Sequence, residues 1–227
     1  MARSASAVIC FLDRDRFTSH SHGMEAIDKR RYASATLRNR DAILGVLKQN
    51  LPDSGLVLEV ASGSGEHALH FAEASAADLV FQPSDPDPGA RASIDAWAAS
   101  LDLPNVRPAV ALDASAEAWP VVRADAVICI NMIHIAPWAA ATGLMRGAAS
   151  VLPPKGILYL YGPYRRGGRH TAPSNEAFDQ SLRTRNPAWG VRDLETVIEL
   201  AASHGFAAPA IEEMPANNLS LIFRRRS

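Results

Sequence analysis

Hydrophobic residues recur along the chain with two different periods, and their order predicts the secondary structure. Residues 34–55 carry leucine and isoleucine at helical spacing, with Ser34 as the candidate N-cap and Pro52 near the end. Short apolar runs that are typical of buried strands occupy residues 56–60, 79–81, 106–112, 124–130 and 156–162. Helical spacing is found between them, over residues 66–76, 88–101 and 140–152.

The C-terminal third continues with two helices and then two strands. The helices are expected over residues 174–185 and 191–205, where Gly205 stands at the position of a left-handed cap, and the strands over residues 206–214 and 219–226. This alternation of strands and helices predicts an α/β fold with a doubly wound parallel sheet and helices on both faces. In such sheets, ligands bind beyond the carboxyl ends of the strands.

The same pattern predicts the domain organisation. Residues 24–227 are expected to form a single domain, because one α/β domain reaches this length. Residues 1–23 lack helical or strand periodicity and are expected to be a disordered extension. A Gly- and Arg-rich stretch begins at residue 162, and residues 162–192 are expected to form a lid over the substrate.

Composition narrows the class of partner. The chain has 23 basic and 24 acidic residues and a formal charge of −1, so an extended nucleic-acid surface is not expected. Only two cysteines are present, and Cys129 lies in an apolar strand, which favours a reducing cytoplasm over a disulfide framework. No apolar run approaches the roughly 18 residues of a membrane span. The histidines are scattered, so we expect no metal site, and the pattern leaves the oligomeric state open.

Polar residues stand at the ends of four consecutive predicted strands. In "LEVASGSGEHA", Gly63 and Gly65 separate a strand from a helix, which allows close backbone approach to a ligand or simply makes a tight turn. Asp85 ends the second strand and can accept both hydroxyls of a ribose, with Asp87 as a competitor for that role and a helix-capping acid as the alternative. Asp113 ends the third strand and can accept from an adenine amino group or cap a turn.

With Glu59, Asp85, Asp113 and Asn131 at these four ends, residues 30–225 resemble the class I S-adenosylmethionine-dependent methyltransferases. The resemblance implies a mostly parallel sheet of seven strands that ends in an antiparallel strand. It also implies that the glycine turn holds the methionine part of the cofactor, that Asp85 binds the ribose and that the third-strand end reads the adenine. The residues expected at the cofactor are Glu59, Ala61, Ser62, Gly63, Gly65, Asp85, Asp113, Ala114 and Asn131.

Several sequence blocks look more narrowly like the methyltransferase-like protein 26 family, a poorly characterised family. These blocks are "LEVASGSGEHALHFA", "QPSDPDP", "INMIHIAPW", "YGPY", "SNEAFDQSLR" with "WGVRDLE", and "MPANNL". The resemblance implies almost nothing about the substrate. Ala61 departs from the usual methyltransferase loop, which has glycine there, and its methyl group is expected to be tolerated if its φ is negative.

Four residues are candidates for the chemistry. S-adenosylmethionine carries an activated methyl group, so the protein has to align an acceptor in line with it and exclude water. Asn131 is expected near the cofactor and the acceptor, and His134 is either the general base or a structural histidine. Tyr161 and Tyr164 can orient the acceptor. Trp138 either forms a flat apolar wall of the pocket or lies in the core, which is favoured, and Arg38 and Asn39 can close over the cofactor.

The function expected from these residues is methyl transfer to a small-molecule acceptor. Two alternatives remain open, of which the first is a protein that binds the cofactor without turnover. The second is a nicotinamide-dependent oxidoreductase, because Gly63, Gly65 and Ala68 satisfy the dinucleotide-binding pattern. The absence of a Tyr-x-x-x-Lys pair in the sequence disfavours that second alternative.

Overall fold

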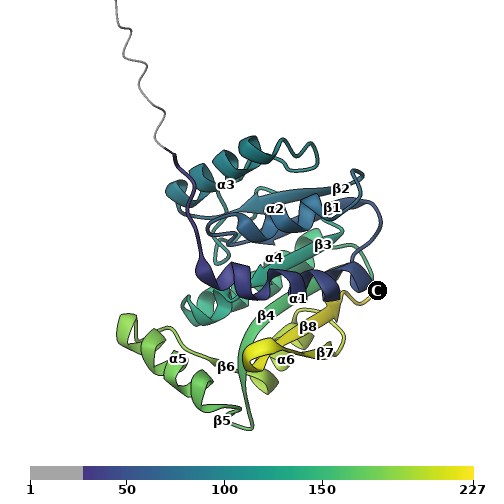
Figure 1. Ribbon diagram of the computed structural model, residues 1–227. Helices are drawn as coiled ribbons and strands as arrows, with labels where there is room; N and C mark the ends of the chain where they lie inside the picture. The colour runs from purple at the N-terminus through teal and green to yellow at the C-terminus, as the bar shows by residue number, and fades with distance from the viewer. Residues whose placement is uncertain (1–27) are drawn as a thin grey trace, which may run out of the picture.

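A central sheet carries the fold in the computed structural model, which describes residues 28–227. Its strands follow the order β2-β1-β3-β4-β8-β7 (Figure 1). The first four are parallel: β1 (Gly55–Val60), β2 (Leu79–Ser84), β3 (Ala126–Ile130) and β4 (Ile157–Arg166). The last two, β7 (Ala210–Met214) and β8 (Asn218–Arg224), run antiparallel. The predicted doubly wound, mostly parallel sheet with a C-terminal antiparallel strand is therefore confirmed.

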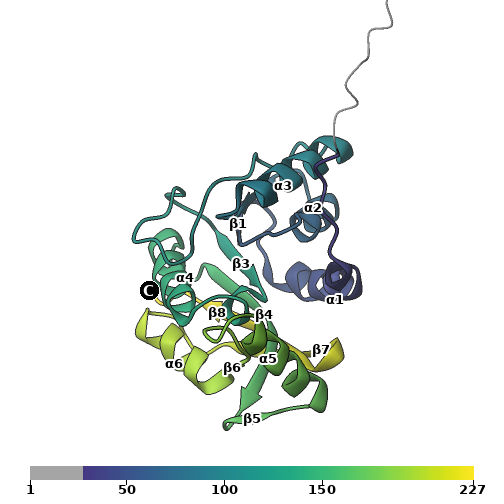
Figure 2. The same ribbon diagram turned by 90° about the vertical axis from the view of Figure 1, so that its left-hand side faces the viewer.

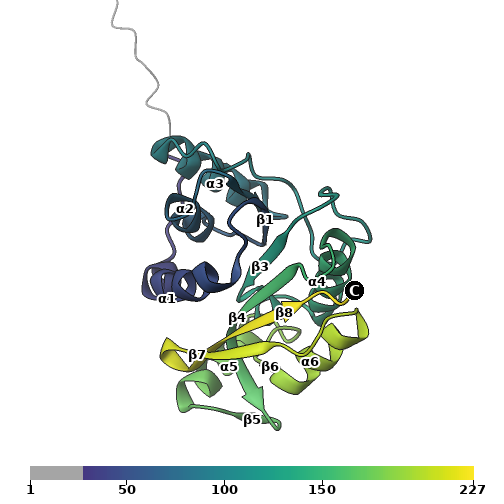
Figure 3. The same cartoon turned by 90° about the vertical axis from the view of Figure 1, so that its right-hand side faces the viewer.

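Six helices accompany the sheet in the described part of the chain: α1 (Ser34–Asn50), α2 (Glu66–Glu73), α3 (Pro88–Leu101), α4 (Trp138–Val151), α5 (Pro173–Arg185) and α6 (Leu194–Ser203). The core cluster on one face of the sheet includes residues of α1 and α2, and the cluster on the other face includes residues of α4 and α6. The side views in Figures 2 and 3 place α5 with the short strands β5 (Arg169–His170) and β6 (Arg192–Asp193) at the far end of β4, away from α3.

Alternation along the strands explains why both faces are apolar. Val57 packs in the cluster under α1 and α2, whereas its neighbour Leu58 packs in the cluster under α4 and α6. Ile128 and Cys129 divide in the same way on β3. Successive side chains of a strand point to opposite faces, so a strand covered on both sides needs a continuous apolar run.

Three local predictions were wrong. Residues 106–112 form no regular strand but only the isolated bridges Phe81↔Val106 and Ser84↔Val110, because Pro108 between them has no N–H to donate. With β5 and β6 paired to β4, the sheet has eight strands instead of seven. Ser34 is the first helical residue of α1, and the N-cap is Ala33. The left-handed conformation predicted for Gly205 is confirmed by its φ of 85°.

Two further observations concern the terminus and the membrane. The extension predicted for residues 1–23 lies outside the described residues. Within residues 28–227, no helix combines the length and the apolar character needed to cross a bilayer.

Candidate functional site

Strand register brings the predicted cofactor residues to one edge of the sheet. Val60 at the end of β1 is in register with Ser84 at the end of β2 and with Cys129 near the end of β3. The glycine turn, Asp85 and Asn131 therefore leave the sheet at the same carboxyl edge. The bridge Ser84↔Val110 places the chain before Asp113 beside β2 at this edge as well.

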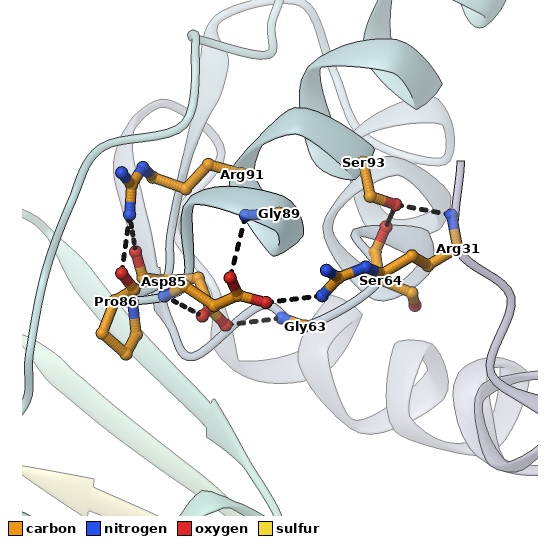
Figure 4. A network of polar contacts seen from close by, with 9 residues as sticks. Arg31, Gly63, Ser64, Asp85, Pro86, Gly89, Arg91 and Ser93 are labelled. Carbon is orange, nitrogen blue, oxygen red and sulfur yellow. Dashed lines mark hydrogen bonds and ion pairs between the residues drawn. The ribbon is translucent and has the colours of Figure 1, made fainter. Parts of the chain in front are cut away.

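The carboxylate of Asp85 holds the glycine turn in place (Figure 4). One of its oxygens accepts from the N–H of Gly63 at 3.0 Å and the other from the N–H of Asp87 at 2.9 Å. A carboxylate offers about four acceptor positions, so these bonds leave room for further donors. Asp85 thus braces the glycine turn and keeps acceptor positions that no described residue occupies.

Asp87 caps a helix and forms an ion pair. Its side chain accepts from the N–H of Gly89 at 2.9 Å at the start of α3, and it pairs with Arg31 at 2.6 Å (Figure 4). The hydrogen bond from Arg31 also lowers the pKa of the Asp87 carboxyl. Arg31 already neutralises Asp87, whereas no described residue forms an ion pair with Asp85, so these contacts favour Asp85 over Asp87 as the acid available to a ligand.

The two glycines of the turn serve different purposes. A side chain at Gly65 would meet the backbone of Ile94 at 2.9 Å, so this glycine permits the close approach of α3. A side chain at Gly63 would meet nothing within 4 Å, and the turn therefore borders open space at this residue. Ala61 has a φ of 59°, so the condition of a negative φ is not met and the chain carries an alanine in left-handed backbone.

Glu59 lies beneath the turn as an incompletely paired buried acid. Its side chain is 2% exposed, and its Oε2 atom has no hydrogen-bond partner among the described residues. Burial and, to a smaller extent, the nearby Asp85 raise the pKa of this carboxyl to about 7, although a hydrogen bond with Ser62 opposes the rise. Its main-chain carbonyl accepts from the hydroxyl of Ser84 at 2.7 Å. An unpaired buried carboxylate is costly unless a cation or a proton neutralises it.

Asp113 is exposed and shapes its own turn. Its Oδ1 atom accepts from the N–H of Ser115 at 2.8 Å and from the hydroxyl of the same residue at 2.7 Å. The neighbouring Ala114 is buried. The alternative role of Asp113, as the cap of a turn, therefore applies to one of its two oxygens. The other oxygen remains available for a ligand.

A segment before α1 crosses this edge, and sequence reasoning missed it. The N–H of Arg31 donates to the hydroxyl of Ser93 at 2.7 Å, and that hydroxyl donates to the carbonyl of Ser64 in the glycine turn at 2.8 Å (Figure 4). The indole of Trp97 donates to the carbonyl of Arg31 at 3.0 Å. The partners in these three bonds are 62, 29 and 66 positions apart in the sequence, so no local pattern could have revealed the bonds.

The exit of β3 turns sharply at Asn131. This residue has a φ of 61°, a conformation that asparagine tolerates, and its N–H donates to the carbonyl of Tyr161 on β4 at 2.8 Å. Gly162 follows Tyr161, and a side chain there would meet the ring Nε2 of His134 at 2.5 Å and the Oδ1 atom of Asn131 at 3.2 Å. Gly162 therefore allows both side chains to converge over β4.

His134 and Tyr164 lie in the interior beside this exit. His134 has no exposed surface, and its Nδ1 atom accepts from the N–H of Arg192 at 3.3 Å. Burial and the charge of Arg192 lower the pKa of the imidazole to about 3. Its ring stands edge-on to that of Tyr164, with 5.1 Å between the ring centroids, and neither Nε2 of His134 nor the phenol of Tyr164 has a described partner. His134 is accordingly neutral at physiological pH and does not open onto solvent.

Asn131 and Tyr161 line a cavity of about 400 Å³. Its walls come from α1, from the ends of β3 and β4, from α5 and from the turn before β8, and they include Arg38, Asn39, Ser174, Asn175, Phe178 and Asn218. Its volume is within the range of small-molecule pockets. Arg38 and Asn39, for which closure over the cofactor was predicted, line this cavity. Trp138 packs against the core cluster, one of the two positions expected for it.

Metal-ligating side chains do not gather at this edge: among residues 28–227, no group of three or more histidine, cysteine, aspartate or glutamate side chains could hold an ion.

Several solved structures share this fold. The mitomycin 7-O-methyltransferase MmcR superposes with a TM-score of 0.72 at 13% identity over 86% of this chain. An O-methyltransferase family 2 protein from Planctomyces limnophilus, in complex with apigenin, gives a TM-score of 0.71 at 16% identity over 84% of this chain. YcgJ from Bacillus subtilis gives 0.64 at 15% identity over 82% of this chain and 99% of its own length.

The chain spans only 55% and 57% of the length of the first two proteins. At these identities the likeness shows the fold, which is that of the class I methyltransferases. The model of one protein family also matches residues 30–225. The chain therefore belongs to the family described as "Protein of unknown function (DUF938)".

Proposed function

We propose that this protein transfers the methyl group of S-adenosylmethionine to a small-molecule acceptor. One observation carries the proposal: the carboxyl edge with the glycine turn, Asp85 and Asp113 joins the 400 Å³ cavity through a shared residue, Asn131. A cofactor edge and an acceptor cavity that meet at one residue are the arrangement that a transfer between two bound molecules requires.

The residues at the edge fit this cofactor. The unpaired Oε2 of Glu59 suits a cationic group such as the ammonium of the methionine part, and Gly63 borders open space for it. The remaining acceptor positions of Asp85 suit the ribose hydroxyls, and Asp113 with Ala114 suits the adenine. Ala61, Ser62 and Gly65 complete the turn. When bound, S-adenosylmethionine supplies a methyl group on a positively charged sulfur.

The chain's own residues would orient the acceptor and exclude water. Burial raises the pKa of the Tyr161 phenol, so this group stays protonated and can donate to the acceptor. Asn131 contributes its amide at the junction of edge and cavity. In this proposal α5, within the 162–192 lid, covers the cavity and keeps water out.

His134 and Tyr164 take supporting roles in the proposal. A neutral imidazole with a pKa of about 3 is a weak base, and its Nδ1 atom is already engaged. Both residues are better suited to fixing Asn131 and Gly162 than to moving a proton. The general-base role of His134 remains a prediction that the experiment below separates from positioning.

Other features extend the proposal. The sequence blocks quoted above favour a relationship to the methyltransferase-like protein 26 family, and the apigenin complex of one structural neighbour favours a small-molecule acceptor. The near-neutral charge and the apolar strand cysteine favour a cytoplasmic location without nucleic-acid or membrane partners.

Isothermal titration with S-adenosylmethionine and with S-adenosylhomocysteine tests the cofactor. We expect both to bind, and Glu59→Gln to weaken binding about tenfold because the neutral amide cannot pair with an ammonium. Glu73→Gln on the exposed side of α2 is the matched control and should bind as the native protein does. Near pH 7, binding should release protons, because a bound ammonium lowers the pKa of Glu59.

The same titration separates the rival functions. Heat with NADH and none with S-adenosylmethionine at millimolar concentration would overturn the proposal in favour of an oxidoreductase. Binding of the cofactor without formation of S-adenosylhomocysteine from any acceptor would favour the non-catalytic alternative.

A further inference from the structure

The cavity beside Asn131 also carries information about the acceptor, and this inference rests on the proposed function. Of the residues that line it, only Arg38 and Tyr161 are ionisable. No carboxylate, thiol or imidazole stands in its described wall. The wall therefore contains no side chain that could take a proton from an acceptor at neutral pH.

The polar groups on the α1 side of the cavity are hydrogen-bond donors. Nε2 of His67 lies 2.9 Å from Oδ1 of Asn39, and because an amide oxygen only accepts, the ring nitrogen donates. Burial lowers the pKa of His67 to about 4, so its ring is neutral. Asn39 offsets part of the rise that burial causes in the pKa of the Tyr161 phenol, and no described residue accepts the phenolic proton of Tyr161. The phenolic proton of Tyr161 is then available to a ligand.

Arg38 adds a positive charge to the same wall. It lies on α1, it is exposed, and it forms no ion pair or hydrogen bond with any described residue. A guanidinium always carries its charge and binds carboxylates in a fork geometry. The α1 wall therefore presents one phenolic donor and one permanent cation to the cavity.

The opposite wall supplies no base. The amide nitrogen of Asn175 donates to the hydroxyl of Thr171 at 3.0 Å and to the carbonyl of Asn217 at 2.9 Å. The amide nitrogen of Asn218 donates to the carbonyl of Pro215 at 3.0 Å. The amide oxygens that remain can accept a hydrogen bond from a ligand, but they do not remove protons.

We infer that the acceptor is a small organic anion whose nucleophilic atom, a carboxylate oxygen or a thiolate sulfur, is already ionised when it binds beside Arg38 and Tyr161. The anionic atom donates an electron pair to the methyl carbon while the bond from that carbon to the sulfonium sulfur breaks. The products are a methyl ester or thioether and neutral S-adenosylhomocysteine, and no proton has to move. Opposite charges are neutralised in this step, which a water-poor cavity favours.

Amines and neutral alcohols are poor acceptors for the same reason. An ammonium ion would meet the charge of Arg38 without a compensating carboxylate, and it would have to lose a proton that no cavity residue can take. A neutral phenol would have to lose its proton as well, with an ordinary pKa of about 10.

Four probes of similar size test the inference: benzoate, thiophenol, phenol and benzylamine. First, the affinity of each probe for the complex with S-adenosylhomocysteine is measured by titration calorimetry. Second, methyl transfer from labelled S-adenosylmethionine to each probe is followed between pH 5 and 9. We expect benzoate or thiophenol to bind and to be methylated, with a rate that follows the ionised fraction of the probe.

Arg38→Gln is the decisive variant, and Lys48→Gln, which removes one exposed positive charge from the same helix, is its control. We expect Arg38→Gln to weaken binding of the anionic probes about tenfold and to leave the affinity for S-adenosylmethionine unchanged. Lys48→Gln should change neither. The comparison of benzoate with thiophenol then identifies oxygen or sulfur as the methylated atom.

A failure of the proposed function and a failure of the anionic acceptor give different results. No binding of S-adenosylmethionine overturns the proposed function itself. Cofactor binding with transfer only to phenol or benzylamine, or with no transfer to any of the four probes, overturns the anionic acceptor alone. If His134→Asn loses activity but still binds the probes, the rate depends on His134. That result would contradict an acceptor that is ionised before it binds. Weaker cofactor binding in Arg38→Gln would assign that charge to the cofactor instead.

Discussion

Left-handed backbone marks the residues at which the strands turn over the carboxyl edge of the sheet. Ala61 and Gly63 have φ values of 59° and 60°, and Asn131 has a φ of 61°. Only glycine adopts this conformation without cost, and asparagine tolerates it better than alanine does. Strained backbone that the surrounding structure holds in place is often found at functional sites. Ala61 is therefore a residue with strained backbone beside the candidate cofactor edge.

Replacing Ala61 by glycine should stabilise the protein. Relief of left-handed strain is worth about 1–2 kcal/mol, and the added freedom of glycine in the unfolded chain offsets about half of it. We expect the free energy of unfolding in urea to rise by up to about 1 kcal/mol. Ala99→Gly on the exposed side of α3 is the control and should lower it by about 1 kcal/mol. Equal losses in both variants would contradict the strain at Ala61.

At the scale of elements, the exit of β3 is held by the segment that leads into α6. Arg192 donates to the carbonyls of Ile133 at 2.9 Å and Ala136 at 2.7 Å, and its guanidinium lies 5.5 Å from the centroid of the Trp138 ring. The N–H of Gly190 donates to the carbonyl of His134 at 2.9 Å. Arg192 and Gly190 thus form a clamp on this turn. Asn131, His134 and Trp138 follow a buried strand because their side chains shape a turn that other elements hold in place.

Removing the clamp should loosen this turn. Arg192→Ala leaves several carbonyls without a donor, and we expect it to lower the free energy of unfolding by about 2–3 kcal/mol. Arg192→Lys should recover only part of the loss, because a single ammonium cannot reproduce the fork of a guanidinium. Urea denaturation followed by tryptophan fluorescence measures both variants.

Arg185→Ala provides the comparison for the clamp. Arg185 lies 5.4 Å from the centroid of the Trp189 ring on an exposed part of α5, and its loss should cost less than about 1 kcal/mol. A similar cost for the two alanine variants would show that Arg192 contributes no more than an exposed arginine.

At the scale of the whole molecule, buried titratable groups couple stability to pH. Burial lowers the pKa of His67 to about 4 and that of His134 to about 3, from an ordinary value of 6.5. Below pH 6.5 these histidines therefore bind protons in the unfolded chain but not in the folded one. Glu59 acts in the opposite sense, because burial raises its pKa from 4.5 to about 7 and the folded protein holds a proton that the unfolded chain releases.

Stability should therefore fall as the pH is lowered from 6.5 to 4.5. Near pH 5.5 the unfolded chain holds about two histidine protons that the folded protein lacks, and the folded protein holds one on Glu59 that the unfolded chain lacks, so about one net proton favours unfolding, at about 1.4 kcal/mol per pH unit. Urea unfolding at three pH values across this window measures the slope. His134→Asn, whose amide oxygen can still accept from Arg192, should flatten it, and an unchanged slope in this variant would contradict the shifted imidazole.

Most of the fold could be predicted from residue patterns. The apolar runs of β1, β3 and β4 and the helical spacing of α1 and α6 are local signals, and the structure contains these elements close to the predicted positions. The segment 106–112 failed because its apolar residues satisfy a strand pattern while Pro108 interrupts the hydrogen bonds. The extent of β4 to Arg166 was missed because its pairing with β5 and β6 depends on residues further along the chain.

The sequence could predict which residues stand at the candidate site, but not their charge states or hydrogen-bond partners. That polar residues end neighbouring parallel strands follows from the order of elements, so Glu59, Asp85 and Asn131 could be named from the sequence. Whether a carboxylate is braced, capped or unpaired depends on contacts across the fold. Asp87 is occupied by Arg31, which is 56 residues away, whereas Oε2 of Glu59 has no described partner.

The sequence by itself determined the class of fold and the set of polar residues at one sheet edge, because periodicity and short motifs are properties of neighbouring residues. Only the tertiary structure decided that His134 is enclosed, that Arg38 and Tyr161 share a cavity, and that no base stands among the described residues that line this cavity. Burial and electrostatic environment come from residues that meet through folding, and these set the charge states on which the chemistry depends.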